Sequence, residues 1–381
     1  MMHKKGLGTA ALMMGLPFVL AAQYKAIDTS DFMDAAHHWY DIRDKGNVIN
    51  PLPGHPKYPA TNISSIADNI LLYQKENGGW PKNYDMQAVL TPAQKDSLTR
   101  ARFELHTGFD NGATYAQIAY LAEAWLQTKD PRYQAAAEKG LAYVLAAQYG
   151  NGGWPQFYPL EKNYSRYITF NDDAYIGIMQ VLKDIVDNKP AYAFLSAKQR
   201  AKLNTGFQKG LDCILKTQIN DAGKPTAWCQ QYDEISLQPA WARKFEPPSI
   251  CNNESAGIVL FLMSIDHPSS AIREAVKNAF EWFTVSEIAD TKVVTIDAPA
   301  MVTPFTVSRH DKVVVNSPGA PPIWTRYYEL KTHRPIFCNR DSRIVYSLAE
   351  VDRERRDGYG WYTYEPQKVL NRYRGWAAKW L

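Results

Sequence analysis

The feature that most constrains the fold is a motif that occurs twice. Residues 77–85 read NGGWPKNYD and residues 151–159 read NGGWPQFYP, so Gly-Gly-Trp-Pro-x-x-Tyr recurs after 154 − 80 = 74 residues. Paired glycines stop a helix, and a proline cannot continue one. The motif therefore predicts an irregular return between two helices, and its recurrence predicts a chain built from repeated units.

Apolar residues at helical spacing precede and follow each motif, as expected for helix, loop, helix. The first unit carries Ile66, Ile70, Leu71 and Tyr73, then Tyr115, Ile118, Ala119, Ala122, Trp125 and Leu126; the second carries Leu141, Val144 and Leu145, then Tyr175, Ile178, Met179, Leu182, Ile185 and Val186. A degraded third unit follows over residues 207–265. We expect a fourth from residue 272 through WTRYYEL to FCNRDSRIVYSLAEV, with a short strand pair at residues 291–305.

Helical hairpins of this kind must stack on their neighbours to bury their apolar faces. The units are longer and less uniform than those of an open solenoid. We therefore expect a mainly α protein, an incomplete α/α toroid with short irregular strands and long loops. Its Gly-Gly-Trp-Pro loops should gather at one end.

The amino-acid composition limits the classes of partner that the protein is expected to bind. Aromatic residues make up 13% of the chain, with 11 Trp and 23 Tyr, which suits a groove that stacks sugar rings and equally suits a packed core. Trp80 and Trp154 are open between these two roles. The formal net charge of +4 permits a polyanionic partner, but no dense basic block favours nucleic acid.

The first residues have the pattern of a targeting segment. Basic residues are followed by a mostly apolar stretch, residues 6–20, and by two small residues, Ala21 and Ala22. We expect residues 1–22 to be a signal peptide, with a membrane anchor as the alternative, and residues 23–381 to form one catalytic domain. The mature protein should be secreted or periplasmic, monomeric and free of the membrane. Its four cysteines, at 213, 229, 251 and 338, could form one or two disulfides.

Acidic residues recur where the second helix of each unit should begin. An acid at a helix start is ordinarily a cap. Their recurrence at equivalent places, however, would bring several carboxylates together in a ring of units and could create a site for a hard cation such as Ca²⁺. These residues are Asp110, Asp172 and Asp173, Glu254 and Asp341.

Arginines lie between these acids, at Arg243, Arg326, Arg340 and Arg343. Taken singly, each is more often a surface ion-pair partner. Arginine is also the side chain suited to two-point capture of a carboxylate. Acids, arginines and aromatics together favour an anionic sugar as ligand.

Five segments in order, the Gly-Gly-Trp-Pro repeats, TFNDDA, WARKFEPPS, the Glu254-Ser255 helix start and WTRYYEL…FCNRDSR, resemble the pectate lyases of polysaccharide lyase family 10. The resemblance spans roughly Ala60 to Tyr364. It implies an (α/α)3 toroid and Ca²⁺-assisted β-elimination of polygalacturonate. Asp110 and Asp172 match the family's calcium and substrate-site aspartates, with Asp173 left as an alternative to Asp172.

By the same resemblance Arg243 matches the family's catalytic arginine. Arg326 and Arg340 fall in segments that match its carboxylate-binding region, and Glu254, Trp80 and Trp154 complete the expected substrate site. Two other functions stay open: an α/α-toroid glycoside hydrolase using two carboxylates, and a non-catalytic polysaccharide-binding protein.

Overall fold

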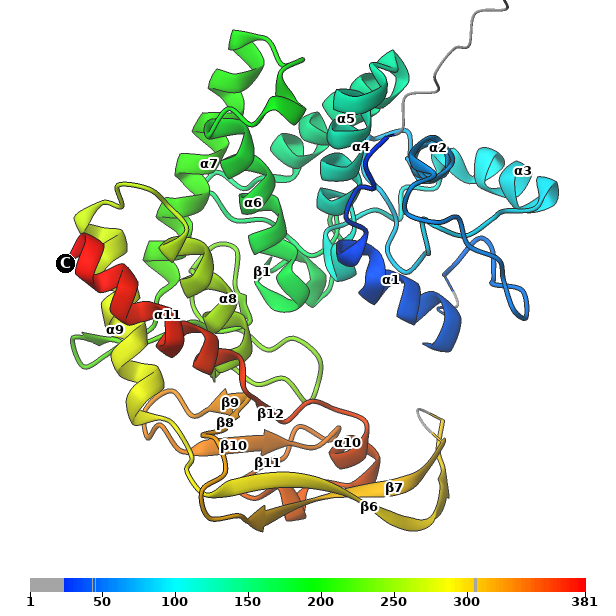
Figure 1. Ribbon diagram of the computed structural model, residues 1–381. Coiled ribbons are helices and arrows are strands. Elements are labelled where there is room, and N and C mark those ends of the chain that lie inside the picture. Colours follow the sequence, from blue (N-terminus) through cyan, green and yellow to red (C-terminus); the bar gives the residue numbers. More distant parts are fainter. Residues whose placement is uncertain (1–23, 43, 45, 305–306) are drawn as a thin grey trace, which may run out of the picture.

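The helices pair along the chain, and the pairs lie side by side in a curved array (Figure 1). The structure, a computed structural model, describes residues 24–42, 44, 46–304 and 307–381; the expected signal segment lies outside them. The α-helices are α1 (Met33–His37), α2 (Ile63–Tyr73), α3 (Pro92–Arg100), α4 (Tyr115–Thr128), α5 (Pro131–Ala147), α6 (Ala174–Val186), α7 (Ala197–Thr217), α8 (Asn252–Met263), α9 (Ser270–Val285), α10 (Arg353–Asp357) and α11 (Glu365–Trp380).

The array has an inner and an outer row. Helices α4, α6 and α8 contact one another in sequence order and form the inner row, while α5, α7 and α9 form the outer row behind them. Helix α2 packs on α4 and α5, and α11 packs on α8 and α9. The rows do not close into a ring, since α2 and α9 lie at opposite ends of the array (Figure 1). The predicted incomplete α/α toroid is confirmed.

Each of the four units contains the same tryptophan anchor. The indole is buried and its Nε1 donates to a carbonyl in the outer helix that precedes it, and a tyrosine follows four residues later. The anchors are Trp80 to Ile70 (2.8 Å), Trp154 to Val144 (2.9 Å), Trp228 to Ile214 (2.8 Å) and Trp324 to Phe283 (2.9 Å). The third and fourth units thus keep the tryptophan and the tyrosine after losing the paired glycines.

This geometry corrects the expectation that Trp80 and Trp154 bind substrate. Their exposed fractions are 0% and 1%, and both indoles face the core. Because no ring face reaches solvent, neither residue can stack on a sugar. Core packing, the alternative left open by composition, is what the structure shows for both.

Two glycines are required by the loops themselves. Gly78 and Gly152 have φ of 96° and 97°, a region that other residues rarely adopt. A Cβ would lie 2.5 Å from the carbonyl oxygen of Lys139 at the first site and 2.0 Å from that of Lys209 at the second. Each loop therefore contacts the backbone of the next outer helix, α5 or α7.

A glutamine amide fastens each loop to that next helix. In each case one Nε2 donates to a carbonyl of its own loop and to a carbonyl of the following outer helix. The three clamps are Gln74 to Gly78 and Ala136, Gln148 to Gly152 and Gly206, and Gln218 to Thr226 and Ala275. The contacts repeat along the array and connect neighbouring units.

The fourth unit departs from the prediction. The helix expected at FCNRDSRIVYSLAEV is wrong: this segment forms β10 (Pro335–Cys338) and β11 (Ile344–Val345), and Asp341 lies in the turn between them. Strand β10 pairs with β9 (Tyr327–Tyr328) on one side and β11 on the other, so its backbone groups are used in a sheet. Helix α11 packs against α8 and α9 instead.

The strand pair predicted near residue 291 is present and is longer than expected. It is the hairpin of β6 and β7, whose strands lie at the edge of the molecule away from the rows of helices (Figure 1). The strands are β1 (Ile168–Thr169), β2 (Asn220–Asp221), β3 (Lys224–Pro225), β4 (Gln231–Tyr232), β5 (Ile250–Cys251), β6 (Thr291–Val302), β7 (Val307–Asn316), β8 (Trp324–Thr325), β9 (Tyr327–Tyr328), β10 (Pro335–Cys338), β11 (Ile344–Val345) and β12 (Tyr362–Thr363).

The cysteine expectation is also corrected. All four cysteines are buried free thiols, packed among core side chains with no disulfide between them. In the described part of the chain, no helix is long and apolar enough to cross a bilayer.

We expect Trp154→Ala to lower the free energy of unfolding by about 3–5 kcal/mol, because it removes a buried indole and leaves the Val144 carbonyl without its donor. Urea unfolding followed by circular dichroism measures this. Trp241→Ala is the control, since Trp241 is 40% exposed and should change stability little. Equal losses in the two variants would contradict the anchoring role.

Candidate functional site

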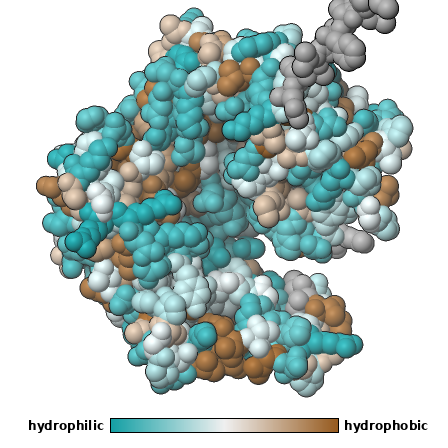
Figure 2. Space-filling view, in the orientation of Figure 1, coloured by the Kyte–Doolittle hydropathy of each residue, from teal (hydrophilic) through white to brown (hydrophobic). Residues whose placement is uncertain are grey.

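A cavity of about 340 Å³ lies between the loops that precede the inner helices and the β-rich segment, which we define as β6 to β12. Figure 2 shows the molecule hollowed between the part that carries α1 and the part that carries β6 and β7, with mostly hydrophilic residues around the hollow. The cavity is lined by Asp34, His38, Ile42, Lys82, Asp110, Asn111, Gln156, Tyr164, Asn171, Asp172, Gln231, Arg243, Glu246, Arg326, Arg355, Gly358 and Tyr359.

The repeated loops supply this site from one equivalent position. The residue two places after each anchoring tryptophan is polar, and in three of the four units it lines the cavity. These residues are Lys82, Gln156, Gln230 and Arg326. Lys82, Gln156 and Arg326 line the cavity, whereas Gln230 lies behind it and accepts the hydroxyl of Tyr327 at 2.9 Å.

Asp110 is contacted by two of these side chains, Lys82 and Gln156. Its Oδ2 lies 2.7 Å from Lys82 Nζ, and its Oδ1 accepts from Gln156 Nε2 at 2.9 Å. The carboxylate is buried and lies at the start of the 3-10 turn η4 (Asp110–Gly112); the N-cap of the following α-helix, α4, is Thr114, which makes no side-chain cap bond. Asp110 is therefore a cavity residue and does not act as a helix cap.

Asp172 and Asp173 lie in a single 3-10 turn, η6 (Asn171–Asp173), with φ of 50° and 56°. This left-handed turn directs Asp172 into the cavity, while Asp173 lines a neighbouring acidic pocket that Asp172 also borders. Burial raises the pKa of Asp172 to about 7; the negative charge of Asp110 adds to the shift and Arg326 opposes it. Asp173 also has a raised pKa, chiefly from burial.

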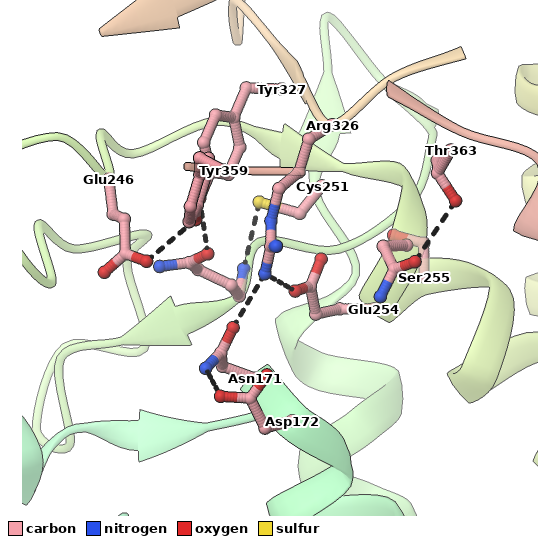
Figure 3. Close-up of polar contacts among 12 residues, drawn as sticks. Asn171, Asp172, Glu246, Cys251, Glu254, Ser255, Arg326, Tyr327, Tyr359 and Thr363 are labelled. Atoms are coloured by element: carbon pink, nitrogen blue, oxygen red, sulfur yellow. Dashed lines mark hydrogen bonds and ion pairs between the residues drawn. The ribbon is translucent and has the colours of Figure 1, made fainter. Parts of the chain in front are cut away.

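Arg326 joins three elements at the cavity wall (Figure 3). Its Nη2 donates to Glu254 Oε1 at 2.6 Å and to Asn171 Oδ1 at 2.9 Å. The guanidinium also lies 4.9 Å from the centroid of the Tyr359 ring. Glu254 is in the first turn of α8 but makes no cap there, and its second oxygen is buried without a partner. The predicted positions of Arg326 and Glu254 beside the site are thus observed.

Arg243 projects from an irregular loop and is partly exposed. It forms a two-point pair with Glu246, through Nε at 2.9 Å and Nη2 at 2.6 Å. Glu246 also accepts the Tyr359 hydroxyl at 2.9 Å, and that hydroxyl lies 2.6 Å from the Tyr327 hydroxyl (Figure 3). Burial lowers the pKa of Arg243, but the bonds and charge of Glu246 outweigh it, so the net shift is upward.

Arg340, the remaining predicted site residue, lies outside the cavity lining. Its Nε and Nη2 donate to Glu354 at 2.8 Å and 2.9 Å, and its guanidinium lies 5.1 Å from the centroid of the Phe245 ring. The expectation that Arg340 contacts substrate in this cavity is therefore not supported by its position, because its donors are directed to Glu354.

Sequence reasoning missed several lining residues. Lys82 and Gln156 could have been found from the sequence, because each follows an anchoring tryptophan, Trp80 or Trp154, at the same fixed offset. The substrate-binding role was instead predicted for the tryptophans themselves. Glu246, Arg355 and Tyr359 carry no such offset, because Glu246 enters the cavity from the loop between β4 and β5, and Arg355 and Tyr359 enter it from the segment between β11 and β12.

The donor set supports a partial cation site. Among the described residues, no group of three or more His, Cys, Asp or Glu side chains is arranged to hold a metal ion. Asp110 and Asp172 nevertheless repel each other in one cavity and offer carboxylate oxygens, with the amides of Asn111 and Asn171 alongside. Hard oxygen donors of this kind suit Ca²⁺ when other oxygens complete the shell. The residues present could therefore supply some of the ligands of such an ion, and oxygens from outside the protein would have to supply the others.

We expect Asp172→Asn to stabilise the metal-free protein by about 1–4 kcal/mol at about pH 8, and by much less at about pH 5. The native carboxyl has its pKa at about 7 and the unfolded one at 3.8, so wild-type stability falls as pH rises between those values. Thermal melts in chelator at both pH values measure the difference. A gain that is independent of pH would contradict the shifted pKa.

Comparisons with known proteins show which family the chain is similar to. The family model described as pectic acid lyase matches residues 74–370. A solved structure of a family 10 polysaccharide lyase from Cellvibrio cellulosa is 30% identical, with a TM-score of 0.70, and covers 83% of this chain and 92% of that one.

A second solved structure is a mutant of a family 10 polysaccharide lyase from Cellvibrio cellulosa, in which one aspartate is replaced by alanine, in complex with trigalacturonic acid. It is also 30% identical, with a TM-score of 0.69, covering 82% of this chain and 92% of the other. The search of curated proteins found no match. Because the family model covers most of the chain and the likeness extends through the fold, the chain belongs to the pectic acid lyase family, polysaccharide lyase family 10.

Proposed function

We propose that the protein cleaves α-1,4-linked polygalacturonate by Ca²⁺-assisted β-elimination, releasing 4,5-unsaturated oligogalacturonides. The observation that carries this proposal is the meeting of Asp110 and Asp172 with Arg243 and Arg326 in one cavity. Two carboxylates and two guanidinium groups suit a substrate whose every unit bears a carboxylate. The trigalacturonic acid bound by the solved relative supports the same class of substrate.

Asp110 and Asp172 are the residues that would hold Ca²⁺, with substrate oxygens as further ligands. When bound, the ion would draw electron density from the uronate carboxylate and so make the proton on C5 more acidic. Asp173 is oriented to the neighbouring pocket, which favours Asp172 as the ligand. Lys82 occupies one oxygen of Asp110 at 2.7 Å and must move aside when a cation takes that oxygen.

Arg326 is placed to stabilise the charge that develops on the uronate carboxylate as the C5 proton leaves. Glu254 and Asn171 hold its Nη2, and its side chain is 14% exposed, so its orientation is fixed before substrate arrives. A preorganised donor in a buried site is more effective than one that must reorganise during the reaction.

Arg243 is the proposed base. Glu246 engages Nε and Nη2, and Arg243 lines the cavity, so Nη1 is the nitrogen proposed to meet the substrate. The Glu246 pair favours the charged guanidinium, so Arg243 must first lose a proton before it can take one from C5. This requirement predicts activity that rises at alkaline pH. The leaving oxygen at C4 takes its proton from solvent.

The location of this activity is inferred from the N-terminal segment. Residues 1–22 have the order of basic, apolar and small residues found in secretory signals. We therefore place the mature enzyme in the periplasm or outside the cell, where polygalacturonate would be met.

We expect the wild type to generate the ultraviolet absorbance of an unsaturated uronide from polygalacturonate, and excess chelator to abolish it. Asp172→Asn and Arg243→Lys should each lower kcat/KM by about 100-fold or more, since each removes a group that acts in the transition state. Asp212→Asn, an exposed change on outer helix α7, is the matched control. Reducing ends without the absorbance would indicate hydrolysis and refute the proposed elimination.

We expect two ionisations to shape the pH-rate profile, and Ca²⁺ to separate them. Asp172, with its pKa at about 7, must lose its proton before a cation binds, so raising Ca²⁺ should move that limb to lower pH. The more alkaline rise belongs to Arg243 and should not move with Ca²⁺. A profile that falls at alkaline pH in the stable enzyme would count against Arg243 as base.

A further inference from the structure

One arginine at the cavity has no close carboxylate partner of its own. Arg355, on α10, is 6% exposed and lines the cavity beside Arg243 and Arg326. Its guanidinium makes no hydrogen bond to any described residue, and its Nε is fully buried. The one carboxylate oxygen within ion-pair distance, in the described chain, is Glu354 Oε1 at 3.8 Å from Nη1.

That glutamate is already engaged elsewhere. Three other arginines in and near the cavity each bond closely to a glutamate. The pairs are Arg243 with Glu246, Arg326 with Glu254, and Arg340 with Glu354. Among the described residues, Arg355 is therefore left without a carboxylate at hydrogen-bond distance, although its positive charge is buried.

Two aromatic rings hold this charge in place. The guanidinium carbon lies 4.1 Å from the Phe245 ring centroid and 4.5 Å from that of Tyr359. Stacking of this kind fixes a planar guanidinium but leaves its donor edge unsatisfied. Burial lowers the pKa of Arg355, and the nearby charges of Arg340 and Arg243 lower it further. An arginine nevertheless stays protonated, so an incoming anion would relieve this cost.

We propose that Arg355 binds a carboxylate of the uronate substrate, with Phe245 and Tyr359 fixing its orientation. The inference rests on the proposed function for the identity of the anion. A carboxylate offers two oxygens in the spacing of a guanidinium edge, and two charge-assisted bonds form without moving the arginine. The substrate carboxylate then gives Arg355 the acidic partner that the three glutamates do not provide. Arg355 thereby discriminates an acidic sugar from its neutral ester.

The test is titration calorimetry with trigalacturonate in chelator, where binding is measured without turnover. Arg355→Met keeps the length and apolar stem of the side chain and should weaken binding about tenfold or more. Arg355→Lys keeps the charge but not the two-point contact, so its loss should be smaller. With the methyl-esterified trisaccharide, wild type and Arg355→Met should bind alike, an equality that a merely structural role would not produce.

Arg353→Met is the matched control, because Arg353 lies on the same helix but donates to the His310 carbonyl of the hairpin, outside the cavity lining. It should bind trigalacturonate as the wild type does. If Arg355→Met melts early, Arg355→Lys decides the question through the same comparison of acid and ester.

The inference would be overturned if a folded Arg355→Met bound the acid as tightly as the wild type, or if it lost equal affinity for acid and ester. The proposed function would still stand in that case, provided that the wild type cleaves polygalacturonate. A wild type that neither binds trigalacturonate nor cleaves the polymer would instead refute the proposed function. Weakened binding of the acid alone supports both.

Discussion

The structure depends on a buried hydrogen bond that recurs four times, from a tryptophan indole to a carbonyl of the preceding outer helix. An unpaired indole N–H or helix carbonyl in the core would cost the desolvation of each group, so the contact fixes where the loop leaves the helix. The tyrosine four residues later holds the other side. Between these supports the chain is free to vary, and at Trp80 and Trp324 the intervening positions are Lys82 and Arg326, two of the cations that line the cavity.

The cavity holds buried ionisable groups that lack a close partner of opposite charge. Asp172 is pushed toward its neutral form by burial and by Asp110, while Arg355 stays buried without a close acid. Buried groups of this kind lower the stability of the free protein, and a bound ligand of opposite charge restores it. A cation at one wall and a carboxylate at the other would satisfy both, which is the division of charge that an anionic sugar and Ca²⁺ together provide.

Much of this could be predicted from the sequence, because helical periodicity and the repeated loop both report local geometry. The paired helices, the incomplete toroid and the strand pair near residue 291 follow from that kind of signal. The roles of Trp80 and Trp154 did not, since an aromatic-rich composition describes a core and a sugar groove equally well. The missing fourth inner helix had no local signal either: residues of β10 become a strand because β9 lies beside them. Arg355 reaches the cavity only through the packing of α10, which the sequence does not encode locally.

The glutamine clamps have a consequence for how the molecule loses its structure. Arrays of helical repeats ordinarily open from their ends, because each unit contacts only its neighbours. Here Gln74, Gln148 and Gln218 each bind their own loop and the next outer helix through one amide. Fraying of an outer helix would therefore release a loop that belongs to the unit before it, together with the side chain that this loop presents. Melting and loss of the binding surface should consequently be one cooperative event.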